Sequence, residues 1–304
     1  MFEANDPRAL ENRERTRDDA HTPQIGHAGD AFVRGLDLPH GPDRERVQAP
    51  GNDGAYALRG SEVRALATIG AFRVVAADDL RDDQGRPGDV RHGDLERLRN
   101  AGLIRSVAPL NRSHRTAIVT LTEQGRELLE HSRAAGSERA QTFFSGALKP
   151  RELSHDAQAY RAFVRTAERI LNDGGRVDRV VLDYELKREY QTFLQERNRG
   201  RSDSDGRPTR TDEEIKAWAR EHELPLVDGR VQFPDFRVEY EHPDGRRDVE
   251  DVEITTLHYR GAHAAGKAAS GFTQFRASTA RVGGSSRSAS SAPFDPHAAE
   301  EWLG

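Results

Sequence analysis

Two groups of basic side chains lie close together in the first half of the chain, within residues 91–99 and 112–115. A guanidinium group can clamp a phosphate, and it can also read the edge of a guanine with two hydrogen bonds. We therefore predict that both groups contact DNA. The first group is Arg91, His92, Arg97 and Arg99, and the second is Arg112, His114 and Arg115.

The same arginines could instead form a solvated face, with Asp94 and Glu96 as local partners. Lysine occurs at only four positions, so 42 of the 46 basic residues are arginine throughout the chain. The net charge of −5 argues weakly against a protein that coats nucleic acid indiscriminately, and it allows a local basic face.

Residues 56–132 contain helix caps, turn residues and apolar positions in an order that places both basic groups. We expect a helix capped by Ser61, a short helix over 76–80, a third helix to about Asn100, two strands over 105–110 and 116–121, and a final helix from Thr122. This arrangement puts the first basic group on the third helix and the second at the tip of a hairpin.

Two motifs in this region resemble the winged-helix family. They are Leu95-x-x-Leu98-x-x-x-Gly102-Leu103-Ile104 and Leu121-Thr122-x-x-Gly125, with the basic hairpin tip between them. The resemblance implies that the third helix enters the major groove of double-stranded DNA while the hairpin, or wing, contacts the adjacent backbone.

The second half of the chain predicts a small α/β unit. We expect an amphipathic helix over 154–172, a strand over 179–182, a charged helix over 183–197, a helix begun by the capping box at Thr211–Glu214, strands over 233–240 and 249–255, and a small-residue helix over 261–275. No further strand is evident after that helix.

Acidic residues on these elements resemble the core of PD-(D/E)XK nucleases. The matching residues are Glu185 on a helix, Pro234-Asp235 on one strand and Glu253-x-Thr255 on the next. The resemblance implies that Asp235 and Glu253 hold a divalent metal, usually Mg²⁺, which supports attack on a phosphodiester. Thr255 stands where the family has a lysine, and Lys267 is the substitute we expect.

The turn His242-Pro243-Asp244-Gly245 decides whether Asp235 and Glu253 can face each other. A two-residue turn would set Asp235 against Ile254 and mix polar with apolar residues on both faces of the hairpin. Apolar burial favours a register shifted by one residue, with Asp235 facing Glu253 or Thr255. We therefore predict a three- or five-residue loop with a left-handed Gly245.

The combination of an N-terminal winged helix with a reduced nuclease-like unit resembles the replication-relaxation proteins of plasmids and other mobile elements. We predict an α+β fold with residues 1–53 disordered or loosely packed, a winged-helix domain over 54–135, a nuclease-like mixed sheet over 150–280 and a flexible tail over 281–304. A mean hydropathy of −0.82 and 32% charged residues favour two small domains over one large core.

The sequence contains no cysteine, and no apolar run is long enough to cross a membrane, so we expect a cytoplasmic protein. No phosphate-binding glycine motif is present, so we expect no nucleotide cofactor. Three functions stay open: a sequence-selective double-stranded DNA binder, in which a homodimer is allowed and the second domain does not cut; a Mg²⁺-dependent endonuclease; and a protein-interaction scaffold.

Overall fold

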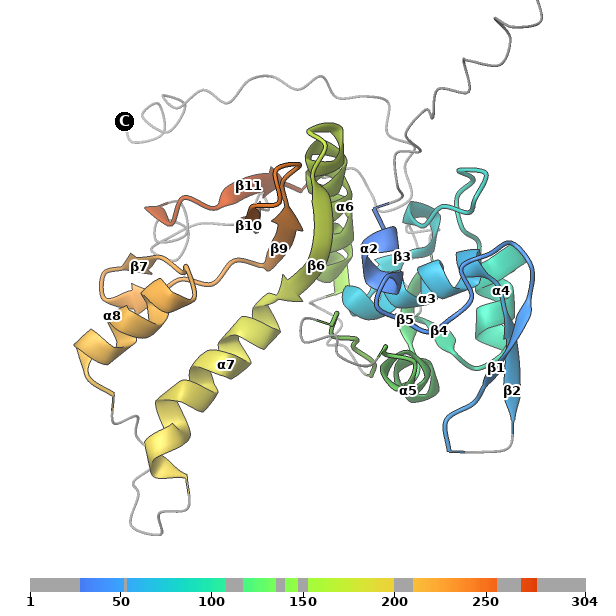
Figure 1. Cartoon of the computed structure of the whole chain (residues 1–304), viewed down its shortest axis with the longest axis horizontal. Coiled ribbons are helices and arrows are strands. Elements are labelled where there is room, and N and C mark those ends of the chain that lie inside the picture. Colours follow the sequence, from blue (N-terminus) through green and yellow to red (C-terminus); the bar gives the residue numbers. More distant parts are fainter. Residues whose placement is uncertain are drawn as a thin grey trace, which may run out of the picture.

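The structure is a computed structural model that describes residues 28–51, 54–107, 117–134, 140–146, 153–199, 210–255 and 269–277 (Figure 1). It is a mixed α+β fold built around several small sheets. None of the helices within these ranges has the length and apolar character needed to cross a membrane.

The first half of the chain surrounds a three-stranded antiparallel sheet, in the order β3-β5-β4. A separate hairpin pairs β1 with β2. The elements are α2 (Asp30–Val33), β1 (Glu45–Gln48), β2 (Ala55–Leu58), α3 (Gly60–Ala71), β3 (Val75–Ala76), the 3-10 helix η1 (Ala77–Asp79), α4 (Gly93–Asn100), β4 (Ile104–Val107), β5 (Ile118–Leu121) and α5 (Glu123–His131).

The second half contains a four-stranded sheet in the order β11-β10-β9-β6. Between β6 and β9 the chain runs through α7 and α8, which extend away from the end of β6 (Figure 1). The elements are α6 (Leu153–Asn172), β6 (Arg176–Leu182), α7 (Asp183–Gln195), the 3-10 helix η2 (Glu196–Asn198), α8 (Asp212–Glu221), β7 (Leu226–Val227), β8 (Arg230–Val231), β9 (Phe236–Glu241), β10 (Arg247–Thr255) and β11 (Thr273–Arg276).

The register of β9 against β10 is one of the two that apolar burial favours. Phe236 pairs with Val252 and Glu241 with Arg247, which leaves a five-residue loop between the strands. Gly245 in that loop has φ +83°, in the left-handed region. The prediction about the loop is confirmed, and the paired Phe236 and Val252 are 0% and 1% exposed.

The end of the sheet differs from the prediction. Residues 273–275 were expected to end the helix over 261–275, but residues 273–276 form β11, which pairs in parallel with the end of β10. The strand has only four residues, and three of them are exposed, so its sequence carries little apolar signal. Residues 256–268, which include the first part of the expected helix, lie outside the described ranges.

The N-terminal segment also differs from the prediction, which left residues 1–53 disordered or loosely packed. From residue 28 the chain forms α2 and then β1, and Phe32 and Leu36 are 1% and 5% exposed. The expected second helix over 76–80 is divided between β3 and the single turn η1, because Val75 and Ala76 pair with β5.

One hydrophobic core joins the two halves of the chain. Phe32 from α2 and Phe72 from the end of α3 pack against Phe163 on α6, with ring centroids 5.3 and 5.1 Å apart from it. Phe72 also lies edge-on to Phe236 at the start of β9, at 6.4 Å. The sheet of the second half is therefore fixed directly to the helices of the first (Figure 1).

Candidate functional site

Asp235 and Glu253 lie together at the end of the four-stranded sheet. Continuing the register of β9 and β10 by one step sets Asp235 opposite Glu253. The regular ladder ends at Phe236 and Val252, and Asp235, just before β9, donates its N–H to the carbonyl of Val252 at 3.0 Å. The Asp235 carboxylate accepts the N–H of Ile254 at 2.7 Å, and Glu253 is 1% exposed.

A histidine completes this carboxylate cluster. His155, in the first turn of α6, has Nε2 3.4 Å from Asp235 Oδ2 and Nδ1 3.6 Å from Asp156 Oδ1. Hydrogen bonding to Asp156, and next to Asp235, raises the pKa of His155 to about 10. The ring is therefore a cation at neutral pH, held between two carboxylates.

Sequence reasoning missed His155 and Asp156 because it treated residues 154–172 only as a source of apolar core positions. His155 and Asp156 lie in the first turn of α6, between the buried Leu153 and Ala157. Two adjacent ionisable side chains at the start of an amphipathic helix were the signal in the sequence.

Within the described residues, no recorded contact joins Glu185 to the cluster of Asp235, Glu253 and His155. Its carboxylate accepts the N–H of Leu182 at 3.1 Å and so caps the first turn of α7. Burial raises the pKa of Glu185, while a hydrogen bond with Thr142 and the capping bond act in the opposite direction. The proposed catalytic lysine, Lys267, lies outside the described residues.

Two carboxylates on one end of a sheet suit a hard divalent cation such as Mg²⁺. The described ranges contain no group of three or more acidic or histidine side chains placed to hold a metal. Asp235 and Glu253 are thus a partial donor set, and one carboxylate oxygen of Asp235 is already used by a backbone amide.

The opposite charges further along the same sheet face are fully paired. Arg237, 6% exposed, forms a two-pronged ion pair with Asp251 at 2.7 and 2.9 Å, and it donates to the carbonyl of His222 at the end of α8. Arg179 pairs with Glu239 in the same two-pronged manner. Arg237 thus docks the end of α8 on the sheet, whereas Arg179 and Glu239 join β6 to β9.

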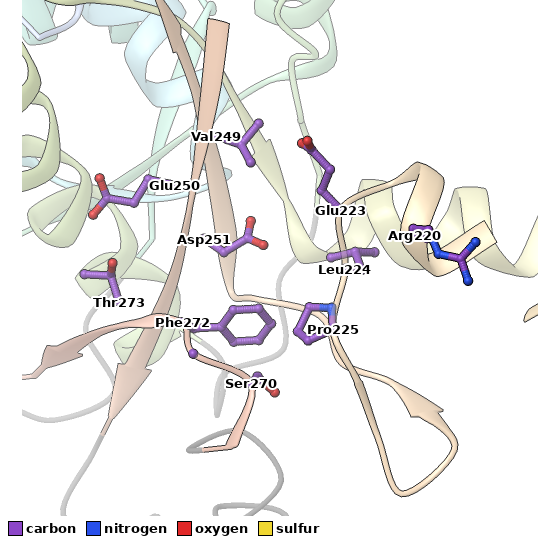
Figure 2. Close-up of a pocket in the computed structure, with 11 residues that line it drawn as sticks. Arg220, Glu223, Leu224, Pro225, Val249, Glu250, Asp251, Ser270, Phe272 and Thr273 are labelled. Carbon is purple, nitrogen blue, oxygen red and sulfur yellow. The ribbon is translucent and has the colours of Figure 1, made fainter. Parts of the chain in front are cut away.

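A groove of about 540 Å³ lies beside this docked helix, between the end of α8 and the β10–β11 edge (Figure 2). Arg220, Glu223, Asp251 and Phe272 are among its lining residues. This mixture of basic, acidic and apolar side chains does not select one class of ligand.

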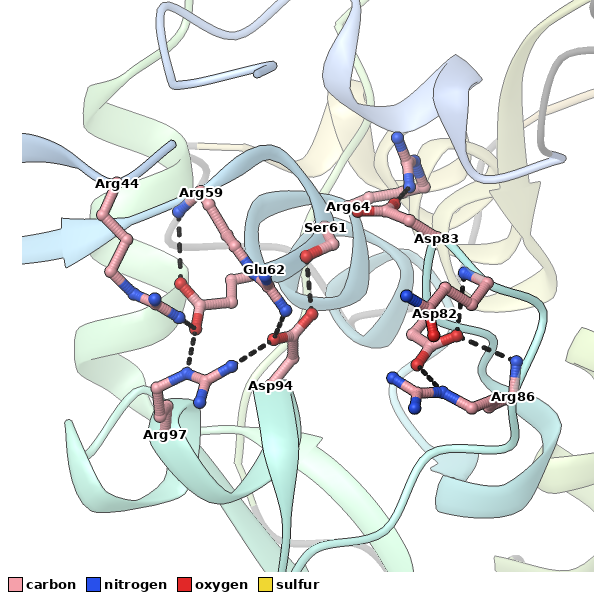
Figure 3. A network of polar contacts seen from close by, with 11 residues as sticks. Arg44, Arg59, Ser61, Glu62, Arg64, Asp82, Asp83, Arg86, Asp94 and Arg97 are labelled. Carbon is pink, nitrogen blue, oxygen red and sulfur yellow. Dashed lines mark hydrogen bonds and ion pairs between the residues drawn. The ribbon is translucent and has the colours of Figure 1, made fainter. Parts of the chain in front are cut away.

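The basic face of α4 is partly committed to the fold (Figure 3). Arg97 donates to Glu62 and Asp94, each at 2.7 Å, and so bridges α4 to α3. Arg44 and Arg59 bind the same two acids at 2.6 Å. Burial opposes ionisation of Asp94, but hydrogen bonds from Ser61, Arg59 and Arg97 outweigh it, and the pKa of Asp94 is lowered.

Arg91 and His92 are exposed at the start of α4, and Arg99 is partly exposed near its end. Leu95 and Leu98, on the opposite side of the helix, are 3% and 1% exposed. Leu95 and Leu98 confirm the inward face expected for this helix. Because α4 begins at Gly93, Arg91 and His92 lie before the helix and not on it as predicted, and Arg97 serves a structural contact. The second basic group, Arg112, His114 and Arg115, lies outside the described residues.

Comparison with models of known protein families, with curated proteins and with solved structures finds no match for this chain.

Proposed function

We propose that the protein binds double-stranded DNA through the unit formed by α3, β3, η1, α4, β4, β5 and α5. The observation that carries the proposal is the order of these elements, together with a sheet whose last strand, β5, lies between the other two. This is the arrangement expected of a winged helix, in which α4 would be the helix that enters the major groove.

The side chains of α4 support the same proposal. Leu95 and Leu98 hold the helix on the core, so its outer face is free to meet a duplex. Arg99 lies on the helix, and Arg91 and His92 lie just before its first residue; none of the three has an ion pair within the described ranges. The link to replication or mobilisation of a plasmid or other mobile element rests on the family resemblance alone and remains a prediction.

Fluorescence anisotropy with a labelled duplex of mixed sequence tests this proposal. We expect Arg91→Gln and Arg99→Gln each to lower affinity several-fold, and to reduce the salt dependence by about one released counterion for each lost phosphate contact. Arg188→Gln on the exposed side of α7 is the matched control, since it removes the same charge elsewhere. Equal affinities for all three variants would refute the assignment of α4.

A second function, metal-dependent DNA cleavage, is favoured by one specific observation. β11 runs parallel to β10, and Asp235, just before β9, lies beside residues 252–254 of β10, which is compatible with the carboxylate arrangement that the family resemblance implies. Asp235 and Glu253 would hold the ion, which would supply Lewis-acid assistance to attack on a phosphodiester. Thr255 and the incomplete donor set count against activity.

Incubation of the protein with single-stranded, duplex and branched DNA in Mg²⁺ or Mn²⁺ decides between binding and cutting. Cleavage that is lost in Asp235→Asn and in Glu253→Gln would support the nuclease. Intact DNA with both metals, beside a duplex that still binds, would leave the protein as a DNA-binding factor. A protein that neither binds nor cuts would favour the interaction scaffold.

A further inference from the structure

A cavity of about 290 Å³ lies where the helices of the first half meet the sheet of the second. It is lined by four arginines but by only one carboxylate, Asp178. The arginines come from four separate segments: Arg34 follows α2, Arg133 follows α5, Arg176 begins β6 and Arg247 begins β10. Such convergence of like charges is unfavourable unless anions offset it.

The recorded carboxylates are too few for these guanidinium groups. Asp178 lies 3.6 Å from Arg34 and 3.3 Å from Arg176, so it serves both. Glu241 pairs with Arg176 at 3.0 Å, and Glu130 pairs with Arg133 at 2.8 Å. For Arg247, which is exposed, the described part of the chain offers no recorded ion pair.

Two further observations show that the protein leaves this cluster incompletely satisfied. Nε of Arg133 is buried and has no hydrogen-bond partner among the described residues. Burial, followed by repulsion from Arg176, lowers the pKa of Arg34 even though Asp178 acts in the opposite direction. A surface arginine beside enough carboxylates would behave in the reverse way.

Hydrogen bonds tie one wall of the cavity to the sheet. Gln141, 7% exposed, uses its amide to bond both the N–H and the carbonyl of Val180 on β6, each at 2.9 Å. Phe32 and Phe143 supply apolar surface on the same cavity. Planar guanidinium groups on a fixed apolar base are suited to the oxygens of a phosphate.

We propose that this cavity, bounded by Arg34, Arg133, Arg176 and Arg247, is a binding site for a phosphate group. The proposal does not depend on DNA recognition by α4, because the four arginines belong to other elements. The phosphate could belong to a free anion or phosphomonoester, or to a nucleic-acid backbone, and its chemistry at the guanidinium groups would be the same.

Isothermal titration with inorganic phosphate and with adenosine 5′-monophosphate tests the site. We expect Arg247→Gln to weaken binding about tenfold, because one charge-assisted contact is lost. Arg247 is exposed, so this variant should fold normally, and Arg188→Gln controls for the loss of one positive charge. Arg34→Gln should weaken binding at least as much, with its folded state checked by thermal unfolding.

The same variants identify the source of the phosphate. Binding of the two small probes to the wild type assigns a small ligand. If only duplex DNA binds, and Arg247→Gln lowers that affinity more than Arg188→Gln does, the ligand is a DNA backbone. The proposal is overturned if neither the small probes nor duplex DNA bind. It is also overturned if Arg247→Gln and Arg188→Gln have equal affinities.

Discussion

The Glu62–Asp94 pair of the first half and the Asp235–Glu253 pair of the second are both withdrawn from solvent, but different groups hold them. Arg44, Arg59 and Arg97 surround the first pair with hydrogen bonds of 2.6–2.7 Å. At Asp235 the recorded contacts are the imidazole of His155 and a backbone amide.

This difference matters because the two kinds of cation behave differently. A guanidinium group keeps its proton at any pH that a protein survives, so the first pair has a constant environment. An imidazole can lose its proton and can be displaced by another cation. We infer that the first pair serves the fold, and that the surroundings of Asp235 depend on the protonation of His155.

The largest effect should come from Glu62→Gln. Glu62 is 1% exposed, and its loss would leave Arg44 and Arg97 without their shared carboxylate. Because both arginines are partly exposed, we expect a decrease in the free energy of unfolding of about 2–3 kcal/mol, below the range for fully buried pairs. Urea denaturation followed by circular dichroism measures it. Glu96→Gln on α4 is the control, and an equal loss there would remove the distinction.

Metal binding tests the second acid pair, Asp235 and Glu253. If the sheet-end acids accept a divalent ion, Mn²⁺ at about one hundred times its Kd should stabilise the folded protein by about 2.7 kcal/mol. The rise in melting temperature should disappear in Asp235→Asn and persist in Asp228→Asn, an exposed acid of the β7–β8 turn. A rise that survives in both variants would place the ion elsewhere.

His155→Gln should lower the free energy of unfolding more at low pH than at high pH. An acidic side chain with a lowered pKa would give the reverse pH dependence. The folded pKa of about 10 is above the ordinary value of 6.5, so the protonated ring stabilises the fold fully below about pH 6.5. That contribution falls as the pH rises toward 10. Since the side chain is 40% exposed, we expect about 1 kcal/mol at most. Unfolding curves at pH 6 and pH 9.5 measure it, and a difference between wild type and variant that grows with pH would contradict it.

Arg97→Gln should have the smallest effect of the series. Its side chain is 45% exposed, and Arg44 and Arg59 remain on Glu62 and Asp94 in its absence. We expect a loss of about 0.5–1 kcal/mol in the free energy of unfolding. Arg99→Gln is the control, because it removes no recorded ion pair and should change the free energy of unfolding by less. A larger loss for Arg99→Gln than for Arg97→Gln would contradict the assignment of Arg97 to the fold.

Local signals in the sequence predicted most of the helices and the central hairpin. Thr122 and Thr211 begin α5 and α8 by capping, with side-chain oxygens 3.1 and 3.3 Å from the third N–H of each helix. Gly102 follows α4 with φ +73°. These features depend on residues close together in the chain, and so they could be read without the fold.

Features that depend on distant residues were not predictable in this way. Ser61 has the side chain of a helix cap, yet α3 begins at Gly60 and the Ser61 hydroxyl donates to Asp94, 33 residues away. Arg97 was expected at the DNA, because nothing nearby in the sequence reveals Glu62 as its partner. β11 owes its pairing to β10, and the histidine at the sheet end meets Asp235 across 80 residues.

The aromatic contacts between Phe32, Phe72, Phe163 and Phe236 also restrict how this protein can evolve. Two units of a chain that are joined only by a flexible linker can exchange between proteins. Here a change of ring size at Phe72 must be matched on α6 and β9, which belong to the other half. The two halves should therefore be inherited together, with substitutions at these four positions linked.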